Sequence, residues 1–292
     1  MMYMLFCRKQ VNRMIIDFHT HVFPDKLAPH AVEALVQGIY TQQGADYRTG
    51  ETLNVCMPTV AGLTALMQRA GVDRSVMLSV ATNAHQQTAV NRFAYTVAQY
   101  GKAHGNVLYA FGAVHPQAED WAEQLDTIAK IGLSGVKLHP QFQETYFDSP
   151  EMIRLLRRAA SLGLPVVFHA GEDIGLPPPT RTTPQRVLNV LEKTDGCTLI
   201  AAHLGGWEMW ADVERYLVGT PVYFDTAFIS RFVPPEQCMR IIRAHGSEKI
   251  LFGSDAPWED PADTLRYLRR LPLTEDEWAN ITHRNALRLL EI

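Results

Sequence analysis

Eight short apolar runs recur along the chain, most of them rich in β-branched residues, and helical patterns separate them. Near-continuous hydrophobic runs are typical of parallel strands that are buried on both faces. A strand followed by a helix, eight times over, predicts parallel strands joined by crossover helices, and therefore an α/β fold of the (β/α)8 TIM-barrel type. The predicted strands cover residues 14–21, 75–82, 107–116, 134–140, 165–172, 198–206, 222–228 and 250–258.

An open, doubly wound sheet is the alternative arrangement of such units. Its dinucleotide-binding form carries a GxGxxG fingerprint after the first strand, which this sequence lacks. A length of 292 residues also suits one barrel. Residues 23–74 form a long insertion after the first strand, with helices expected near 28–40 and 59–71.

The predicted helices have recognisable ends. Ser149 is expected to cap a helix that has Pro150 at its first position. Thr274 and Glu277 have the spacing of a capping box, so a C-terminal helix is predicted to begin there. The later helices are expected over residues 150–163, 183–196, 234–246, 261–271 and 274–292.

The chain is predicted to form a single barrel domain over residues 14–292, with residues 1–13 as an N-terminal extension outside the fold. That extension, MMYMLFCRKQVNR, places its charges after a short apolar start, which is the opposite order to a signal peptide. No apolar run reaches the ~18 residues needed to cross a bilayer, so a membrane protein is not expected.

Charge and cysteine content narrow the function classes. The 27 Lys and Arg and 31 Asp and Glu give a net charge of −4, which argues against a general nucleic-acid binder. The cysteines, Cys7, Cys56, Cys197 and Cys238, are far apart and form no CxxC pair. A structural zinc site or a disulfide framework is therefore not expected, and a reducing cytoplasm is the predicted location.

Polar residues fall where several of the predicted strands end. The carboxyl ends of barrel strands meet at one mouth, where catalytic residues are found. Four histidines and one aspartate from four strands are therefore expected to converge there. The strand-end residues are His19 and His21 on the first strand, Lys137 and His139 on the fourth, His169 and Glu172 on the fifth, His203 on the sixth and Asp255 on the eighth.

The first strand carries the pair that suggests a metal ion. A period of two places His19 and His21 on one inward face, with Asp17 one layer below. A single buried histidine is usually a hydrogen-bonded core residue, but several imidazoles at one mouth are costly to bury without partners. A shared metal ion would satisfy them. The residues expected to face the helices are Ile16, Phe18 and Thr20.

Four motifs carry a family resemblance: DFHTH, FHAGE, AHLGG and FGSDAPW, on the first, fifth, sixth and eighth strands. In this order they resemble the amidohydrolase superfamily, in particular its amidohydrolase-related branch of metal-dependent TIM-barrel hydrolases and decarboxylases. The resemblance extends from Met14 to the C-terminal NALRLL. It implies that His19, His21, His169 and Asp255 bind metal.

The resemblance also implies catalytic roles and leaves the number of ions open. Asp255 would take a proton from a metal-bound water, and His203 would act as acid or base, orient the substrate, or bind a second ion. Lys137 matches a lysine that bridges two ions when carboxylated, but GVKLHP also resembles the single-metal branch, so one ion is favoured. Three imidazoles and a carboxylate suit zinc, with manganese or iron as alternatives.

Residues near the mouth supply candidates for substrate binding. Lys137, Arg181 and Arg231 have the charge to bind a carboxylate, and solvent-facing charge is the alternative for the arginines. Glu172 is a candidate hydrogen-bond acceptor behind His169, and Trp258 follows the eighth strand. His139, which precedes a proline, is either structural or part of a substrate or second-metal site.

These features lead to one expected function and two alternatives. The expected protein is a metal-dependent hydrolase that uses a metal-activated water on an amide, ester or lactone of a small, carboxylated molecule. A non-oxidative decarboxylase of a small carboxylic acid has the same metal shell and is the alternative. A non-catalytic binding scaffold is a third reading. The resemblance also allows a homodimer.

Overall fold

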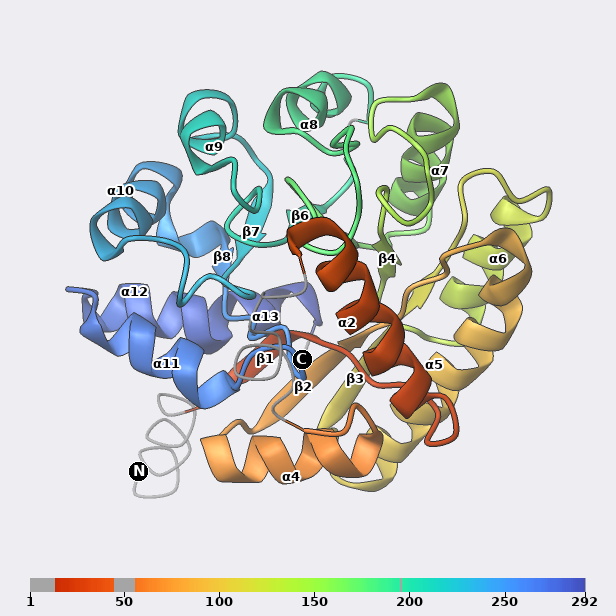
Figure 1. Cartoon of the computed structure of the whole chain (residues 1–292), viewed down its shortest axis with the longest axis horizontal. Coiled ribbons are helices and arrows are strands. Elements are labelled where there is room, and N and C mark those ends of the chain that lie inside the picture. Colours follow the sequence, from red (N-terminus) through yellow and green to blue (C-terminus); the bar gives the residue numbers. More distant parts are fainter. Residues whose placement is uncertain (1–13, 45–55, 195, 292) are drawn as a thin grey trace.

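The computed structural model describes residues 14–44, 56–194 and 196–291. Eight parallel strands follow one another round the sheet in chain order, with helices on the outside (Figure 1), so the predicted (β/α)8 barrel is confirmed. The predicted N-terminal extension, residues 1–13, lies outside the described residues. The strands are β1 (Ile16–Thr20), β2 (Arg74–Leu78), β3 (Leu108–Ala113), β4 (Val136–Leu138), β5 (Val166–Phe168), β6 (Leu199–Ala201), β7 (Tyr223–Asp225) and β8 (Ile250–Leu251).

Hydrogen bonds between β1 and the segment after β8 close the sheet. The backbone N–H of His21 donates to Ala256 O at 2.6 Å, and the N–H of Asp255 donates to His19 O at 2.8 Å. These bonds place His19 of β1 and His21, just after it, directly beside Asp255, although more than 230 positions separate them from it in the sequence.

The helices begin at residues that supply the expected caps. Ser149 accepts from the N–H of Met152, and Thr183 accepts from the N–H of Arg186. In both helices a proline occupies the first turn, where its missing N–H costs nothing. The helices up to the C-terminal segment are α2 (Ala28–Gln43), α4 (Val60–Ala70), α5 (Gln87–Ala103), α6 (Trp121–Lys130), α7 (Pro150–Ser161), α8 (Pro184–Leu191), α9 (Trp210–Tyr216), α10 (Pro235–His245) and α11 (Pro261–Arg270).

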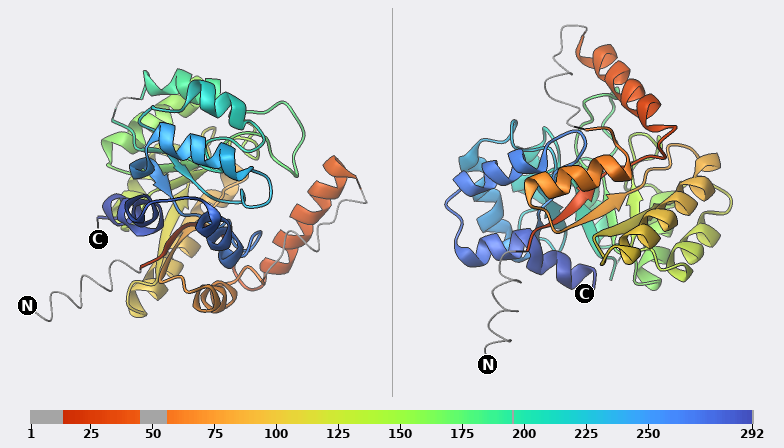
Figure 2. Two further views of the ribbon diagram at one scale, coloured as in Figure 1. Left: turned by 90° about the vertical axis from the view of Figure 1, so that its left-hand side faces the viewer. Right: turned by 90° about the horizontal axis from the view of Figure 1, so that it is seen from below.

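The insertion after β1 carries both predicted helices, α2 and α4. Helix α2 projects from the barrel, whereas α4 packs along its side (Figure 2). No helix among the described residues is long and apolar enough to cross a membrane.

The C-terminal segment is helical as predicted, but it is not one regular α-helix. Helix α12 (Glu275–Ala279) runs into a π-helical turn (Asn280–Arg284) and then into α13 (Asn285–Leu289). The carbonyl of Ile281 accepts the backbone N–H of Phe252 at 2.8 Å, and Asn285 Nδ2 donates to Ile250 O at 2.6 Å. These bonds to β8 and the residue after it divert the helix from a regular α-helical ladder.

Removing the cap of this segment tests its contribution to stability. Thr274 Oγ1 accepts from the N–H of Glu277, and the Glu277 side chain accepts from the N–H of Thr274, so the predicted capping box is confirmed. Thr274→Ala is expected to lower the free energy of unfolding by about 1 kcal/mol, measured by urea denaturation. Thr41→Ala, on the exposed face of α2, is the control and should change it by less than about 0.5 kcal/mol.

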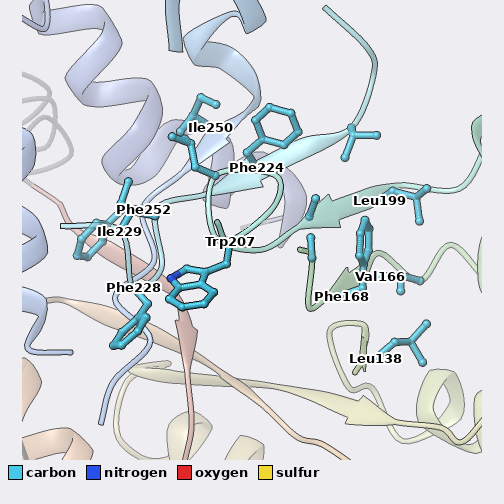
Figure 3. Packing of buried hydrophobic residues seen from close by; sticks show 14 of the residues in the cluster. Leu138, Val166, Phe168, Leu199, Trp207, Phe224, Phe228, Ile229, Ile250 and Phe252 are labelled. Carbon is cyan, nitrogen blue, oxygen red and sulfur yellow. The ribbon is translucent and has the colours of Figure 1, made fainter. Parts of the chain in front are cut away.

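The apolar core has two layers. The larger layer lies between the strands and the helices, and Figure 3 shows part of it, including Phe168 of β5, Phe224 of β7 and Trp207. The smaller layer fills the barrel itself, with Val167, Ile200 and Leu251 from three strands, and residues of α13 pack against it. The barrel interior is therefore a packed core, and any cavity has to lie at one of its ends.

Strand β1 departs from the expected alternation. Ile16 and Phe18 belong to the interior cluster, and Phe18 meets Phe111 edge to face, so the prediction that they face the helices is wrong. The cause is a register shift between Asp17 and Thr20, which interrupts the alternation of side chains. His19 nevertheless points inward, where it contacts Lys137 of β4.

Candidate active site

A cavity of about 710 Å³ opens at the carboxyl ends of the strands. Its polar groups include most of the residues predicted from the strand ends. Its remaining lining is largely apolar and comes from the β1 loop, α2, the end of β2 and the loop after it, α5 and the loops after β4 to β8. The polar group contains His19, His21, Lys137, His139, His169, Glu172, Asp173, His203 and Asp255, and the apolar and aromatic group includes Phe23, Leu27, Leu35, Phe93, Phe142, Trp207, Phe228 and Trp258.

Three predicted metal ligands meet at the seam of the barrel. The Nε2 atoms of His19 and His21 are 3.2 Å apart. Asp255 Oδ1 lies 3.3 Å from His19 Nε2 and 3.1 Å from His21 Nε2. One atom from each residue therefore faces the same point, as in a metal site.

The second nitrogen of each ring fixes its tautomer. His19 Nδ1 donates to Asp225 Oδ2 at 2.8 Å, and His21 Nδ1 donates to the backbone oxygen of Leu78 at 2.9 Å. A carboxylate or carbonyl oxygen can only accept, so the proton of each neutral ring is on Nδ1. Both Nε2 atoms consequently present lone pairs toward Asp255.

The histidines that follow β5 and β6, His169 and His203, repeat this pattern. His169 Nε2 donates to Glu172 O at 2.9 Å, and His203 Nδ1 donates to Ala227 O at 2.9 Å. The remaining nitrogens, His169 Nδ1 and His203 Nε2, face each other at 3.1 Å. Burial lowers the pKa of each of these two histidines to about 4, so both rings are neutral in the resting site at neutral pH.

These contacts are the test of whether a metal ion fits the site. Lone pairs that face one another at 3.1–3.3 Å repel unless a cation lies between them. Burial is also the main cause that lowers the pKa of His19, with Lys137 adding to it, so protonation does not resolve the repulsion. The imidazole nitrogens and the Asp255 carboxylate are the donor types that bind zinc and manganese in proteins. The donor set fits a divalent ion.

Lys137 lies next to the same cluster. Its Nζ is 3.3 Å from His19 Nε2, and the residue is 1% exposed. Burial lowers the pKa of Lys137 to about 8, although Asp225 and Asp255 partly offset that effect. Lys137 is thus a buried cation that faces the cavity and can approach a substrate carboxylate.

Two site residues have an uncommon backbone conformation. His203 has φ of 59° and Asp255 has φ of 70°, in the left-handed region that side chains other than glycine seldom adopt. Each such residue costs of order 1–3 kcal/mol and is often found at a functional site. The N–H of His203 is held by Asp225 Oδ1 at 2.9 Å, which keeps this turn in place.

A second group of polar residues lies beside His169. His139 stacks on His169 with ring centroids 4.3 Å apart, and Asp173 Oδ2 lies 3.4 Å from His139 Nε2. His139 also lines the cavity. Glu172 does accept a hydrogen bond from His169 as predicted, but through its backbone oxygen rather than its carboxylate.

The predicted substrate-binding residues are divided between the cavity and the surface around it. Trp258, like Lys137, lines the cavity. The Arg181 guanidinium lies over the ring of Tyr146 at 5.3 Å, and Arg231 forms an ion pair with Asp263 at 3.8 Å. Neither arginine lines the cavity. Among the described residues that do line it, Lys137 is the one lysine or arginine.

Two carboxylates of the site were missing from the sequence prediction. Asp225 ends β7 and accepts from His19, His203 and Ala227, and Asp173 follows β5. The sequence did contain a signal for Asp225, because VYFDTAF places an acid at the end of a predicted buried strand. For Asp173 the signal was weaker, since it lies in a loop beside Glu172.

The chain belongs to the amidohydrolase family, because residues 16–292 match the family profile described as Amidohydrolase. The match and the eight-stranded barrel are those of a metal-dependent enzyme of the amidohydrolase superfamily, which confirms the resemblance seen in the sequence. Comparison with curated proteins finds no match.

Solved structures similar to the chain include several decarboxylases. The 5-carboxyvanillate decarboxylase of Sphingomonas paucimobilis has 17% identity and a TM-score of 0.72, with 96% of this chain and 99% of that chain covered. The 2,6-dihydroxybenzoate decarboxylase from Rhizobium has 16% identity and a TM-score of 0.68, with 95% of this chain and 98% of that chain covered. The 5-carboxyvanillate decarboxylase from Novosphingobium aromaticivorans was solved with manganese and 4-hydroxy-3-methoxy-5-nitrobenzoic acid. It has 14% identity and a TM-score of 0.69, with 96% of this chain and 96% of that chain covered. At these identities the likeness concerns the fold.

The expectation of a hydrolase is corrected by these neighbours. Hydrolysis was preferred from the sequence because the ligand motifs suggested a metal-activated water. The three solved structures named above are decarboxylases, which favours the alternative reading over hydrolysis. The two reactions share their ligands, so the motifs alone could not separate them.

Proposed function

We propose that the chain is a metal-dependent non-oxidative decarboxylase of a small carboxylic acid, and that residues 14–292 act as one domain. One observation carries this proposal: lone pairs of His19 and His21 face Asp255, and those of His169 and His203 face each other, beside the buried Lys137 in a largely apolar cavity. The decarboxylase neighbours support the choice of reaction.

His19, His21, His169 and Asp255 would hold one divalent ion, with His203 beside them. When bound, the ion supplies positive charge that holds the carboxylate and stabilises the electrons left on carbon as CO2 departs. Zinc and manganese both accept this donor set. A manganese-bound neighbour makes manganese the first ion to test. A second ion would require carboxylation of Lys137.

The side chains around the ion would bind the substrate and deliver a proton. Lys137 Nζ would pair with the substrate carboxylate at the cavity floor. The apolar walls exclude water, and loss of CO2 converts a charged group into a neutral one, which a weakly polar cavity favours. The bond between the carboxylate carbon and the rest of the substrate breaks, and its electron pair takes up a proton. Asp255 and His203 are the groups proposed to carry that proton.

The cavity accepts a small molecule, and its chemistry gives no reason to propose a nucleic-acid or membrane partner. We also propose a cytoplasmic location, from the cysteine pattern, and a homodimer, which the family resemblance allows.

A metal-dependence experiment tests the function. The full chain is stripped with a chelator, reloaded with manganese or zinc, and incubated with a panel of aromatic and aliphatic carboxylic acids. We expect CO2 release, with a product that lacks one carboxyl group, from the reloaded protein and not from the stripped protein. Hydrolysis of esters, amides or lactones in place of CO2 release would contradict the proposal, and elemental analysis would give the number of ions per chain.

A further inference from the structure

We propose that the substrate carries an apolar tail, which lies between α2 and α5 while its carboxylate lies at Lys137. The inference rests on the proposed function for the carboxylate and adds the chemical class of the rest of the molecule. The part of the cavity between the two helices is called the apolar annex here. Its walls are formed by Ala31, Ala34 and Leu35 of α2 and by Ala89, Val90 and Phe93 of α5.

The size of the cavity is the first observation behind the annex. Pockets for drug-sized ligands measure about 300–1,000 Å³, and this cavity measures about 710 Å³. The metal ligands and Lys137 line only the part of it at the strand ends. A compact acid that ended beside these groups would leave water against the apolar walls of the annex. The remaining volume therefore fits a second, apolar part of the ligand.

Helix α2 is held near its two ends, and its middle lines the annex. Ala28 and Ile39 are its buried residues, and Gln43 Nε2 donates to Ile174 O at 3.2 Å, which joins the end of the helix to the loop after β5. Figure 1 shows α2 in front of the strands. Between its two anchors, Leu35 is half-buried and Ala34 is exposed. An apolar ligand would remove this face from water, which is favourable in proportion to the area covered.

Helix α5 supplies the second wall. Ala89 and Val90 are four and three residues before Phe93, so the three side chains share one face of the helix. Ala89 is exposed, and Val90 and Phe93 are half-buried. The helix itself is fixed to the barrel through Ala94, which is buried in the larger core layer. Two apolar faces with incomplete burial, from separate parts of the chain, therefore line the same cavity.

The polarity of the lining gives the ligand its direction. The charged residues of the cavity, Lys137, Glu172, Asp173 and Asp255, all follow strands or lie in them, whereas the lining residues that α2 and α5 contribute include no Asp, Glu, Lys or Arg. A carboxylate is thus matched at Lys137. A second charge in the annex would be covered without a partner, which is costly. The cavity therefore favours an acid that is charged at one end and apolar at the other.

Binding of linear acids of increasing length tests the annex. Butanoate, hexanoate and octanoate serve as binding probes, and each is titrated by calorimetry into the manganese-loaded full chain. Affinity is expected to rise about threefold or more for each added methylene, or about tenfold for each two-carbon step. Octanedioate has the same length as octanoate but a charge at both ends, and it should bind about tenfold or more weakly than octanoate.

Two variants fill the annex from opposite walls. Ala34→Trp and Ala89→Trp should each reduce the preference for octanoate over butanoate to about threefold or less, because the added ring occupies the space of the tail. The affinity for butanoate should stay within about twofold, since butanoate does not reach the annex. Ala103→Trp is the matched control: Ala103 is exposed, does not line the cavity and lies about 20 Å along α5 from Ala89. Circular dichroism checks that all three variants fold.

Several results would overturn the annex. These are no binding of octanoate, an affinity that does not depend on chain length, octanedioate bound as tightly as octanoate, or an unchanged preference in both filling variants. Sedimentation of the same samples tests the other occupant of this face. A dimer that Ala34→Trp dissociates, without chain-length dependence in the wild type, would assign the face to a second copy of the chain.

The readout separates this inference from the proposed function. Binding that depends on chain length, without CO2 release from any acid, would contradict the decarboxylase and leave the annex standing. CO2 release without any chain-length dependence of binding would do the reverse.

Discussion

Replacing Asp255 by asparagine is expected to reduce decarboxylation by about 10³-fold or more while leaving the barrel folded. Asp255 Oδ1 is within 3.3 Å of both His19 Nε2 and His21 Nε2, so it is the anionic member of the donor set. Asparagine has nearly the same shape but brings neither the negative charge nor the capacity to carry a proton at this point. The measurement is kcat/KM for CO2 release, with metal content determined on the same sample.

Metal content separates the two roles of Asp255. A variant that retains its ion but not turnover would place Asp255 in proton transfer, and one that loses the ion would place it mainly in metal binding. Asp126→Asn makes the same chemical change at an exposed ion pair and should keep full activity. Turnover close to that of the wild type in Asp255→Asn would remove this residue from the proposed site.

The second large effect is expected from Asp225→Asn, which does not touch the proposed ion directly. Asp225 Oδ2 accepts from His19 Nδ1, and Oδ1 accepts from the N–H groups of His203 and Ala227. An asparagine can keep Oδ1 against the two backbone donors, but it then presents an N–H₂ group to His19 Nδ1. The His19 proton would move to Nε2, where it blocks the lone pair that faces Asp255.

We therefore expect Asp225→Asn to lower metal affinity by about 10–100-fold, as is usual when a partner behind a ligating histidine is removed. Competition with a metallochromic chelator measures that affinity, and circular dichroism checks that the barrel is intact. Excess manganese should restore part of the turnover, which a directly catalytic role would not allow. Unchanged metal affinity would show that Asp225 only supports the backbone of the turn at His203.

Much of the fold followed from local pattern. Eight apolar runs and the caps at Ser149 and Thr274 gave the strand count, the strand order and the starts of two helices correctly, because these depend on nearby residues. The direction of side chains on β1 did not follow, since a register shift against β2 decides it. The π-helical turn near Ile281 was also hidden, because a hydrogen bond from Phe252, distant in sequence, diverts the helix there.

The candidate site shows the same division. The strand-end pattern predicted that His19, His21 and Asp255 converge at the barrel mouth, and the structure places them together. It did not reveal that Asp225 sets the tautomer of His19, or that Arg181 stacks on Tyr146 instead of lining the cavity. The choice between hydrolysis and decarboxylation was wrong because both reactions use the same ligands.

The sequence by itself determined which residues can bind a cation and that they lie at the carboxyl ends of parallel strands, because strand periodicity and residue chemistry are local properties. Only the tertiary structure decided which nitrogen of each ring carries its proton, and that Asp173 and His139 lie side by side in one cavity. Those features depend on hydrogen-bond acceptors supplied by other strands and loops, and closure of the barrel between β1 and the segment after β8 is what brings His19 and His21 to Asp255.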